Sequence, residues 1–460
     1  MPQDLSKLDG VATIAAFKSG AVTPTTYAEG LIERAAQNSH LNALQSFAAI
    51  ALGSDTIDAI AAAPEGPLAG LPVLAKDNIN TNTYPTSGGT KALLHHTPKA
   101  NAGVVNRIKD AGGFIAAKAS MHELAFGITS NNAVTGAVHN PVDPDMIAGG
   151  SSGGTAAAVA AGIFPIGLGT DTGGSCRIPA ALCGVVGFRP TTVRYNGDGV
   201  LPISHTRDTV GTIARSVRDI SLMDSVLSGE AENAGVAELS QVRLGVPKDR
   251  FFDDLEPAVA AAIEAQLSVL SNAGAKLVDI RFETIWEHND AFGFPVVLYE
   301  VMRDLPAYLA EHAPDTSFEA LIAGIGSPDV AGAFASQMGA DAMPQAAYDA
   351  AMNVHRPAMR QIYAQAFADH DLNAIVFPTT PLTARPIGQD ETVELNGAQV
   401  PTFPTYIRNT DLGSNIGAPG ISLPCPVISG LPVGIEFDAL PGQDRALLAL
   451  ATAVEKAMAQ

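Results

Sequence analysis

The chain has 460 residues, of which 47% are hydrophobic and 16% are charged, and its formal net charge is −20. This composition predicts an ordered globular protein with a substantial core. The acidic balance argues against nucleic acid or an anionic membrane as a partner, because both would be repelled by the surface.

The sequence shows no feature typical of a secreted or membrane-spanning protein. Its three cysteines, an odd number without paired spacing, argue against a disulfide framework and fit a reducing compartment (Cys176, Cys183 and Cys425). Residues 1–10 lack the basic and apolar regions of a secretory signal. No uninterrupted apolar run reaches the roughly 18 residues of a membrane span. We therefore expect a cytoplasmic protein without a membrane partner.

Residues 1–63 are predicted to form N-terminal helices. Apolar residues recur at a three-residue step and indicate a first helix that Gly20 ends (Leu8, Val11, Ile14 and Phe17). Thr23 then has the character of a helix N-cap, with Pro24 as the first helical residue. A loop rich in proline and glycine, 64–70, follows these helices.

In residues 64–225, short apolar strands alternate with helices of small residues. Strands are predicted at Leu71–Ala75, Phe114–Lys118 and Ile163–Leu168, and the clearest helix at Ala156–Ala161. Such alternation predicts an α/β fold with a large mixed β-sheet core covered by helices.

Residues 226–370 begin with one more α/β unit and then become helical. The unit comprises a strand at Leu244–Val246, a helix at Ala258–Leu270 and a strand at Lys276–Ile280. Long helical segments follow, including Pro344–His370, and we expect this region to cover the site and shape the substrate pocket.

Residues 371–460 return to the sheet. Strands are predicted at Ala374–Phe377 and around Ile421–Phe437, and a last helix begins at Asp444. No stretch is polar enough for a flexible linker, so we expect one domain over 1–460 with a helical subregion.

The stretch 149–190 is the most informative part of the sequence. In Thr170–Ser175, glycines let the chain turn tightly after a strand, so that successive N–H groups can converge on one oxygen. An amide hydrolase needs such donors for the oxyanion that forms when the carbonyl is attacked. The alternative is a tight turn without a ligand. Asp171 and Arg177 are interpreted as an ion pair that holds this turn.

Ser151 and Lys76 each have a structural and a catalytic interpretation. Ser151 is either a helix N-cap or the serine of a G-x-S-x-G nucleophile elbow, although the polar, proline-broken segment 141–145 disagrees with the strand that an elbow requires. Lys76 either ends a strand in a salt bridge with Asp77 or is a buried amine whose lowered pKa lets it accept a proton.

At these residues the chain resembles the amidase signature family. The resemblance rests on the GGSSGG segment at 149–154, the GTDTGGSCRIPA segment at 169–180 and Lys76 in the KDN segment. It extends from about residue 71 to 218 and resumes at 415–434. Within the family, segments 121–132, 197–209 and 430–440 are most similar to indoleacetamide and mandelamide hydrolases. Aryl acylamidases and urethanase-type relatives share the same core.

The resemblance implies roles for individual residues. Ser175 would be the nucleophile, and Ser151, preceded by a cis peptide bond, would pass a proton between Ser175 and Lys76. Backbone N–H groups of the turn would form the oxyanion hole (Thr172, Gly173 and Gly174). Ala125 would supply a backbone contact to the substrate. Cys176 is a less favoured nucleophile, and the resemblance implies neither a metal nor a cofactor.

The implied function is hydrolysis of a carboxylic amide through an acyl-enzyme, giving an acid and ammonia or an amine. An aryl-alkyl primary amide or an anilide is the expected substrate. Carbamate (urethane) or ester hydrolysis on the same core is an alternative. An amidotransferase glutaminase subunit, or an α/β-hydrolase using Ser151 with His205 as base, is a weaker one. The expected partner is a small-molecule amide, and a homodimer is the candidate assembly.

Overall fold

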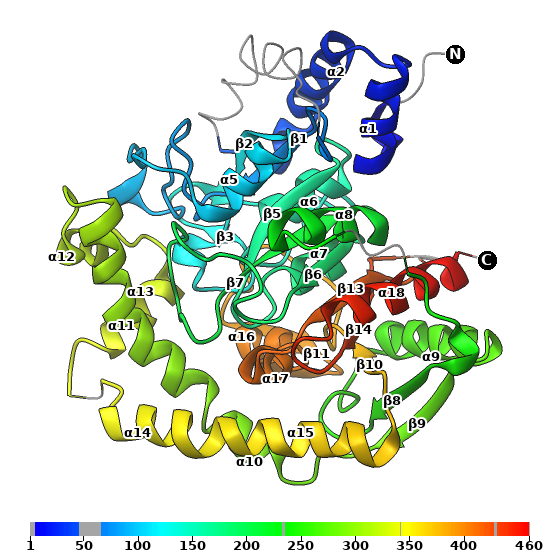
Figure 1. Cartoon of the computed structure of the whole chain (residues 1–460). Coiled ribbons are helices and arrows are strands. Elements are labelled where there is room, and N and C mark those ends of the chain that lie inside the picture. Colours follow the sequence, from blue (N-terminus) through cyan, green and yellow to red (C-terminus); the bar gives the residue numbers. More distant parts are fainter. Residues whose placement is uncertain (1–4, 46–65, 232–234, 341, 427–429, 460) are drawn as a thin grey trace.

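The computed structural model describes residues 5–45, 66–231, 235–340, 342–426 and 430–459. A ten-stranded sheet runs through the middle of the molecule (Figure 1), with the strand order β2-β1-β5-β7-β6-β13-β14-β10-β8-β9. Its strands are β1 (Pro72–Lys76), β2 (Phe114–Ala119), β5 (Ile166–Asp171), β6 (Val186–Arg189), β7 (Thr209–Ala214), β8 (Arg243–Pro247), β9 (Lys276–Ile280), β10 (Ala374–Pro378), β13 (Gly420–Pro424) and β14 (Gly434–Asp438).

The pairing of these strands is parallel at both ends of the sheet and antiparallel in between. β1 pairs in parallel with β2 and β5, and β8 with β9 and β10. The strands from β5 to β10 pair antiparallel. Every residue of β1, β5, β6, β7, β10 and β14 is buried, as expected of strands covered by helices on both faces. The predicted mixed α/β fold is confirmed.

Helices surround this sheet, and two small ribbons lie outside it (Figure 1). The ribbons pair β3 (Asn131–Asn132) with β4 (Gly136–Ala137) and β11 (Thr392–Leu395) with β12 (Ala398–Pro401). The α-helices are α1 (Gly10–Ser19), α2 (Pro24–Gln37), α5 (Gly103–Asp110), α6 (Gly153–Ala160), α7 (Arg177–Cys183), α8 (Val217–Ser228), α9 (Pro257–Asn272), α10 (Ile285–Asp290), α11 (Gly293–His312), α12 (Phe318–Ala323), α13 (Pro328–Ser336), α14 (Gln345–Ala350), α15 (Arg356–His370), α16 (Thr402–Ile407), α17 (Asp411–Ile416) and α18 (Asp444–Met458).

The N-terminal helices begin and end where the capping residues indicated. Gly20 ends α1 in the left-handed conformation, which glycine adopts without steric cost. Thr23 caps α2 by accepting a hydrogen bond from the N–H of Thr26, and Pro24 is the first helical residue. The remainder of the predicted helical region, 46–63, and the first two residues of the loop at 64–70 lie outside the described residues.

One predicted strand is misplaced. The strand expected at Ile163–Leu168 is β5, which begins at Ile166 and runs on to Asp171. Pro165 lacks an N–H group for the ladder, so the strand starts after it. Its end was missed because Thr170 and Asp171 are polar, although both pair with β7.

The helical region forms one side and the lower edge of the view in Figure 1. The helix predicted over Pro344–His370 consists of α14, a π-helical turn at Ala351–His355 and α15. Helix α18 begins at Asp444, as predicted. In the described ranges, no helix has the length and apolar character needed to cross a bilayer.

Candidate active site

Lys76 is the last residue of β1, and its amine is hydrogen-bonded to two hydroxyl groups. Its Nζ donates to Ser151 Oγ and to Thr170 Oγ1, both at 2.8 Å. The Nδ2 of Asn78 donates to the same Thr170 hydroxyl at 3.0 Å. All of these side chains are buried. A lysine in this setting has two neutral partners and no bonded carboxylate among the described residues.

Burial governs the charge of this amine. Removal from water disfavours the ammonium form and lowers the pKa of Lys76 to about 7, although the negative charges of Asp171 and Asp208 act in the opposite sense. A large part of the Lys76 population is therefore uncharged near neutral pH and can accept a proton.

Ser151 lies between Lys76 and the turn that carries Ser175. The peptide bond between Gly150 and Ser151 is cis. Ser152, not Ser151, is the N-cap residue of α6, and its N–H donates to the carbonyl of Ser175 at 3.2 Å. Lys76 and Ser151 are thus joined directly, and Ser175 is tied to them through the backbone. Within the described residues, no hydrogen bond joins the hydroxyls of Ser151 and Ser175.

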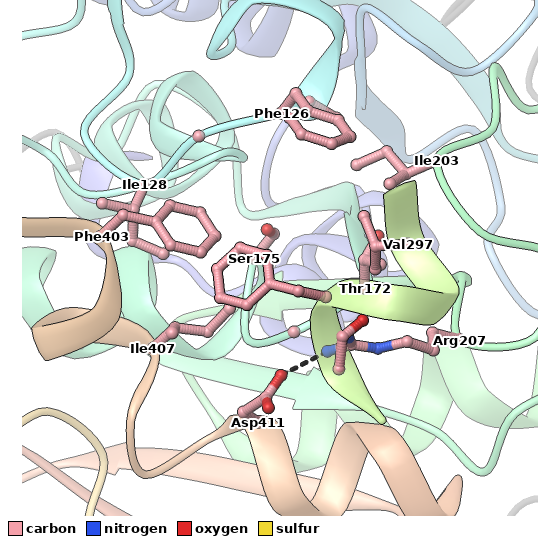
Figure 2. A pocket seen from close by; sticks show the side chains of 15 residues that line it. Phe126, Ile128, Thr172, Ser175, Ile203, Arg207, Val297, Phe403, Ile407 and Asp411 are labelled. Carbon is pink, nitrogen blue, oxygen red and sulfur yellow. Dashed lines mark hydrogen bonds and ion pairs between the residues drawn. The ribbon is translucent and has the colours of Figure 1, made fainter. Parts of the chain in front are cut away.

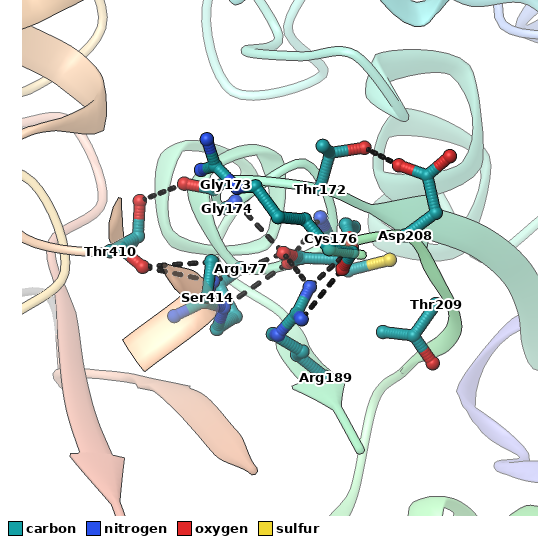
Figure 3. Close-up of polar contacts among 12 residues, drawn as sticks. Thr172, Gly173, Gly174, Cys176, Arg177, Arg189, Asp208, Thr209, Thr410 and Ser414 are labelled. Atoms are coloured by element: carbon teal, nitrogen blue, oxygen red, sulfur yellow. Dashed lines mark hydrogen bonds and ion pairs between the residues drawn. The ribbon is translucent and has the colours of Figure 1, made fainter. Parts of the chain in front are cut away.

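Asp171 holds the turn that leads to Ser175. Figure 3 labels Gly174, Cys176 and Arg177 of this turn, with Arg189 beside them. Its carboxylate accepts hydrogen bonds from the N–H groups of Gly174 (2.8 Å) and Cys176 (3.0 Å) and from the guanidinium of Arg177 (3.0 and 3.1 Å). Burial alone would raise the pKa of Asp171, but Arg177 and Arg189 outweigh it and hold the pKa below its usual range. The ion pair expected between Asp171 and Arg177 is present, and Arg189 also bonds to Asp171.

The turn at 172–175 leaves three backbone N–H groups without a hydrogen-bond partner in the described residues, and a fourth is bonded to Asp171. In the part of the chain that the structure describes, the N–H groups of Thr172, Gly173 and Ser175 have no hydrogen-bond partner. That of Gly174, also expected in the oxyanion hole, is bonded to Asp171. Gly174 has φ +134, and a Cβ there would lie 2.2 Å from Thr410 Oγ1, so only glycine fits.

Ser175 faces a small apolar pocket of about 90 Å³ (Figure 2). Ala125, with φ +58, and Thr172 lie in its wall beside the serine. The pocket is also lined by large apolar side chains from α11, α16 and neighbouring loops (Phe126, Ile128, Ile203, Phe294, Val297, Phe403 and Ile407). Since α11 belongs to the helical region, residues distant in sequence shape the space in front of Ser175.

Arg207 and Asp411 bring the only charges to the described lining of this pocket. They form an ion pair, seen as a dashed line in Figure 2. Arg207 also donates to the carbonyl of Gly293 at 3.2 Å. Because the two charges compensate each other, the pocket as a whole suits an uncharged group.

The contacts disagree with three alternative roles that the sequence left open: Asp77 as the salt-bridge partner of Lys76, His205 as a base for Ser151, and Cys176 as the nucleophile. Asp77 does not pair with Lys76; it lies 3.5 Å from the Nζ of Lys118 and bonds to Ser87. His205 Nδ1 lies 2.8 Å from Asp304, and Ser151 is bonded to an amine instead of an imidazole. Burial raises the pKa of the Cys176 thiol to about 12, so that it stays protonated.

One group of potential metal ligands lies outside the pocket. Atoms of His205, Glu300 and Asp304 lie within 4.8 Å of one another. The guanidinium of Arg303 already fills this position: it lies 2.7 Å from Asp304 Oδ1 and 2.6 Å from His205 Nδ1. The cluster is therefore satisfied by a cation of the chain itself.

Thr170, Asn78, Arg207 and Asp411 were not singled out from the sequence. Asn78 and Thr170 belong to the two motifs that carry Lys76 and Ser175, and this membership could have marked them as site residues. No sequence pattern links Arg207 with Asp411, because 204 residues separate them.

Comparison with known proteins agrees with this geometry. The sequence profile of the family described as "Amidase" matches residues 27–448. The chain belongs to the amidase family. It is 47% identical to an indoleacetamide hydrolase of Rhizobium radiobacter over 85% of this chain and 84% of that protein. It is 40% identical to a mandelamide hydrolase of Pseudomonas putida over 99% and 92%.

The fold of this amidase is also that of a solved member. A crystal structure of an amidase superimposes with a TM-score of 0.84 and 34% identity, covering 98% of this chain and 100% of that one. The resemblance noted in the sequence is thus confirmed at the level of family and fold, and the protein is a hydrolase of non-peptide C–N bonds.

Proposed function

We propose that this amidase hydrolyses an uncharged aryl-alkyl amide through an acyl-enzyme on Ser175, with Ser151 and Lys76 as the proton relay. The observation that carries the proposal is the buried amine of Lys76, whose pKa is lowered to about 7 and which bonds to Ser151. The next residue, Ser152, is bonded through its N–H to Ser175, which lines the apolar pocket. A neutral amine can take the proton that a serine must lose to become a nucleophile.

In the first step, Ser175 Oγ attacks the carbonyl carbon while its proton passes to Ser151 and the proton of Ser151 passes to Lys76. The two hydroxyls approach to hydrogen-bonding distance when substrate fills the pocket, since catalytic hydrogen bonds commonly tighten in the complex. The free N–H groups of Thr172, Gly173 and Ser175 bind the oxyanion. Gly174 supports them by fixing the turn to Asp171.

The tetrahedral intermediate then loses its amine. Lys76 returns the proton through Ser151 to the departing nitrogen, the C–N bond breaks, and the acyl group remains on Ser175. Water enters, gives a proton to the same relay and releases the acid, which restores the Ser175 hydroxyl. Ala125 supplies a backbone contact to the substrate.

The acyl half of the substrate is proposed from the pocket. Its aromatic and aliphatic lining and its compensated Arg207–Asp411 pair favour an uncharged aryl-alkyl group. The named activities of the indoleacetamide and mandelamide hydrolases support this choice. In this account, the 226–370 region shapes the acyl pocket through α11. The buried, free cysteines support a cytoplasmic location.

A panel of substrates tests the function. The purified enzyme is offered arylacetamides, anilides, aryl carbamates and aryl esters, with Ser175→Ala as the blank. We expect the arylacetamides to be cleaved with the highest kcat/KM. Faster turnover of the carbamates would favour a urethanase. Glutamine hydrolysis that exceeds arylacetamide hydrolysis would favour an amidotransferase subunit.

A further inference from the structure

A second cavity, of about 370 Å³, lies next to the pocket of Ser175. The two spaces share Ala125, Thr172 and Ile203, which form a common wall. Small-molecule sites usually occupy roughly 300 to 1,000 Å³. The pocket of Ser175 is smaller than that range, whereas the second cavity lies within it, so a whole substrate has more room if it extends past the shared wall.

The second cavity approaches the lysine side of the site. Asn78 and Thr170 line it, and Thr170 is bonded to the amine of Lys76. In the mechanism proposed above, the leaving nitrogen receives its proton from Lys76 through Ser151. The nitrogen of the scissile bond must therefore face the lysine side, and a substituent on that nitrogen is directed toward this cavity, away from the acyl pocket.

The walls of the cavity suit an amine with an organic substituent. Four adjacent residues and one strand residue give it apolar surface (Val200, Leu201, Pro202, Ile203 and Val210). Asp198 and Asp208 add carboxyl groups that can form hydrogen bonds with the N–H groups of the departing amine. Asp208 is partly buried and accepts hydrogen bonds from Thr172 Oγ1 (2.6 Å) and the N–H of Ile203 (2.8 Å), which fixes the shared wall.

From this geometry we propose that the second cavity is the binding site for the amine half of N-substituted amides, so that the enzyme cleaves secondary amides such as anilides as well as primary amides. The proposal rests on the proposed function. For an amide R–CO–NH–R′, the Ser175 Oγ–C bond forms and the C–N bond breaks. The nitrogen takes the relayed proton and leaves as H₂N–R′ through the cavity, and water then releases R–COOH.

Gly197, on the rim of the cavity, offers a site for blocking it. A Cβ at this residue would meet no heavy atom of the described residues within 4 Å, so the first carbon of a larger side chain fits without a clash. Gly339 is a matched control, since a Cβ there would also meet nothing within 4 Å in the described part of the chain, and it lines neither cavity. The variants Gly197→Phe and Gly339→Phe are compared with the unchanged enzyme, with thermal unfolding as the check on folding.

The measurement is kcat/KM for phenylacetamide and for its N-phenyl and N-benzyl derivatives. We expect the unchanged enzyme to cleave all three, and Gly197→Phe to lower the ratio of anilide to primary-amide turnover by about tenfold or more, as loss of a well-filled subsite does. Gly339→Phe should keep the ratio of the unchanged enzyme.

Two results would overturn the inference while leaving the function intact: cleavage of phenylacetamide but of neither derivative, or an equal loss on all three substrates in Gly197→Phe. The first needs no variant, so the test survives a misfolded Gly197→Phe protein. Failure to cleave any of the three amides would instead contradict the proposed function.

Discussion

The amine of Lys76 lies 2.8 Å from the hydroxyl of Ser151 in a contact that water does not reach. Thr170 is its other hydrogen-bond partner in the described part of the chain. A lysine that ends a buried strand without a bonded carboxylate loses its charge more easily than one in a salt bridge. This contact connects the sheet, through β1, to the segment that carries the serines.

The pH dependence of hydrolysis should follow the charge of Lys76. Because burial lowers its pKa to about 7, the amine is protonated and has no lone pair below that pH. We therefore expect kcat/KM for an arylacetamide to rise with pH, with a midpoint near 7, and to level off above it. The profile is measured in buffers of constant ionic strength. A flat profile through this range would contradict an uncharged lysine as the base.

Thr170→Val should slow catalysis without weakening the binding of substrate in the acyl pocket. The change removes the hydroxyl that orients the amine of Lys76, so we expect kcat to fall by roughly 10- to 100-fold with little change in KM. The hydroxyl stabilises the ammonium more than the amine, so its loss should also move the acid limb of the pH profile to lower pH.

Thr212→Val is the control for that change. Thr212 is buried in the neighbouring strand β7, and its hydroxyl has no hydrogen-bond partner in the described ranges. We expect this variant to keep both kcat and the pH profile of the unchanged enzyme. Equal losses in the two variants would show that Thr170 matters only for packing.

Asp171→Asn should destabilise the fold as well as the site. The substitution removes the charge that compensates Arg177 and Arg189 and weakens the bonds to the turn. Breaking a buried ion pair from one side costs about 3–5 kcal/mol. The midpoint of urea unfolding should therefore move to a lower urea concentration. Asp279→Asn, at an exposed pair with Lys248, should change stability by less than about 1 kcal/mol.

Cys176→Ala should retain activity. The thiol is buried beside the nucleophile, and burial raises its pKa to about 12, so the reactive thiolate is scarce. Hydrolysis rates within a few-fold of the unchanged enzyme, and no inactivation by iodoacetamide in the native state, are the expected results. Loss of activity comparable to that of Ser175→Ala would instead make Cys176 the nucleophile.

The sequence alone predicted much of this framework for identifiable reasons. Thr23 and Pro24 are strong local signals, and α2 begins at Pro24. The apolar run before Lys76 has the character of a buried strand, which β1 is. These features depend on neighbouring residues, so reading the sequence locally was sufficient.

Features that depend on distant residues were not predictable in this way. Asp411 pairs with Arg207 across 204 positions, and Lys118 pairs with Asp77 across the β1–β2 ladder. The hydrogen bond from the Gly174 N–H to Asp171 joins two residues that are close in sequence. The turn that points this N–H at Asp171, and not at the pocket, nevertheless packs closely against the distant Thr410. Periodicity and motifs carry no information on such contacts.

Lys76, acting through Ser151, is proposed to activate Ser175. The decisive experiment labels the enzyme with a serine-reactive fluorophosphonate, maps the modified peptide by mass spectrometry and times the reaction in Lys76→Met. We expect a single label on Ser175 and a labelling rate lower by roughly 100-fold or more without the lysine. A label on Ser151 or Cys176, or an unchanged rate in Lys76→Met, would contradict this proposal.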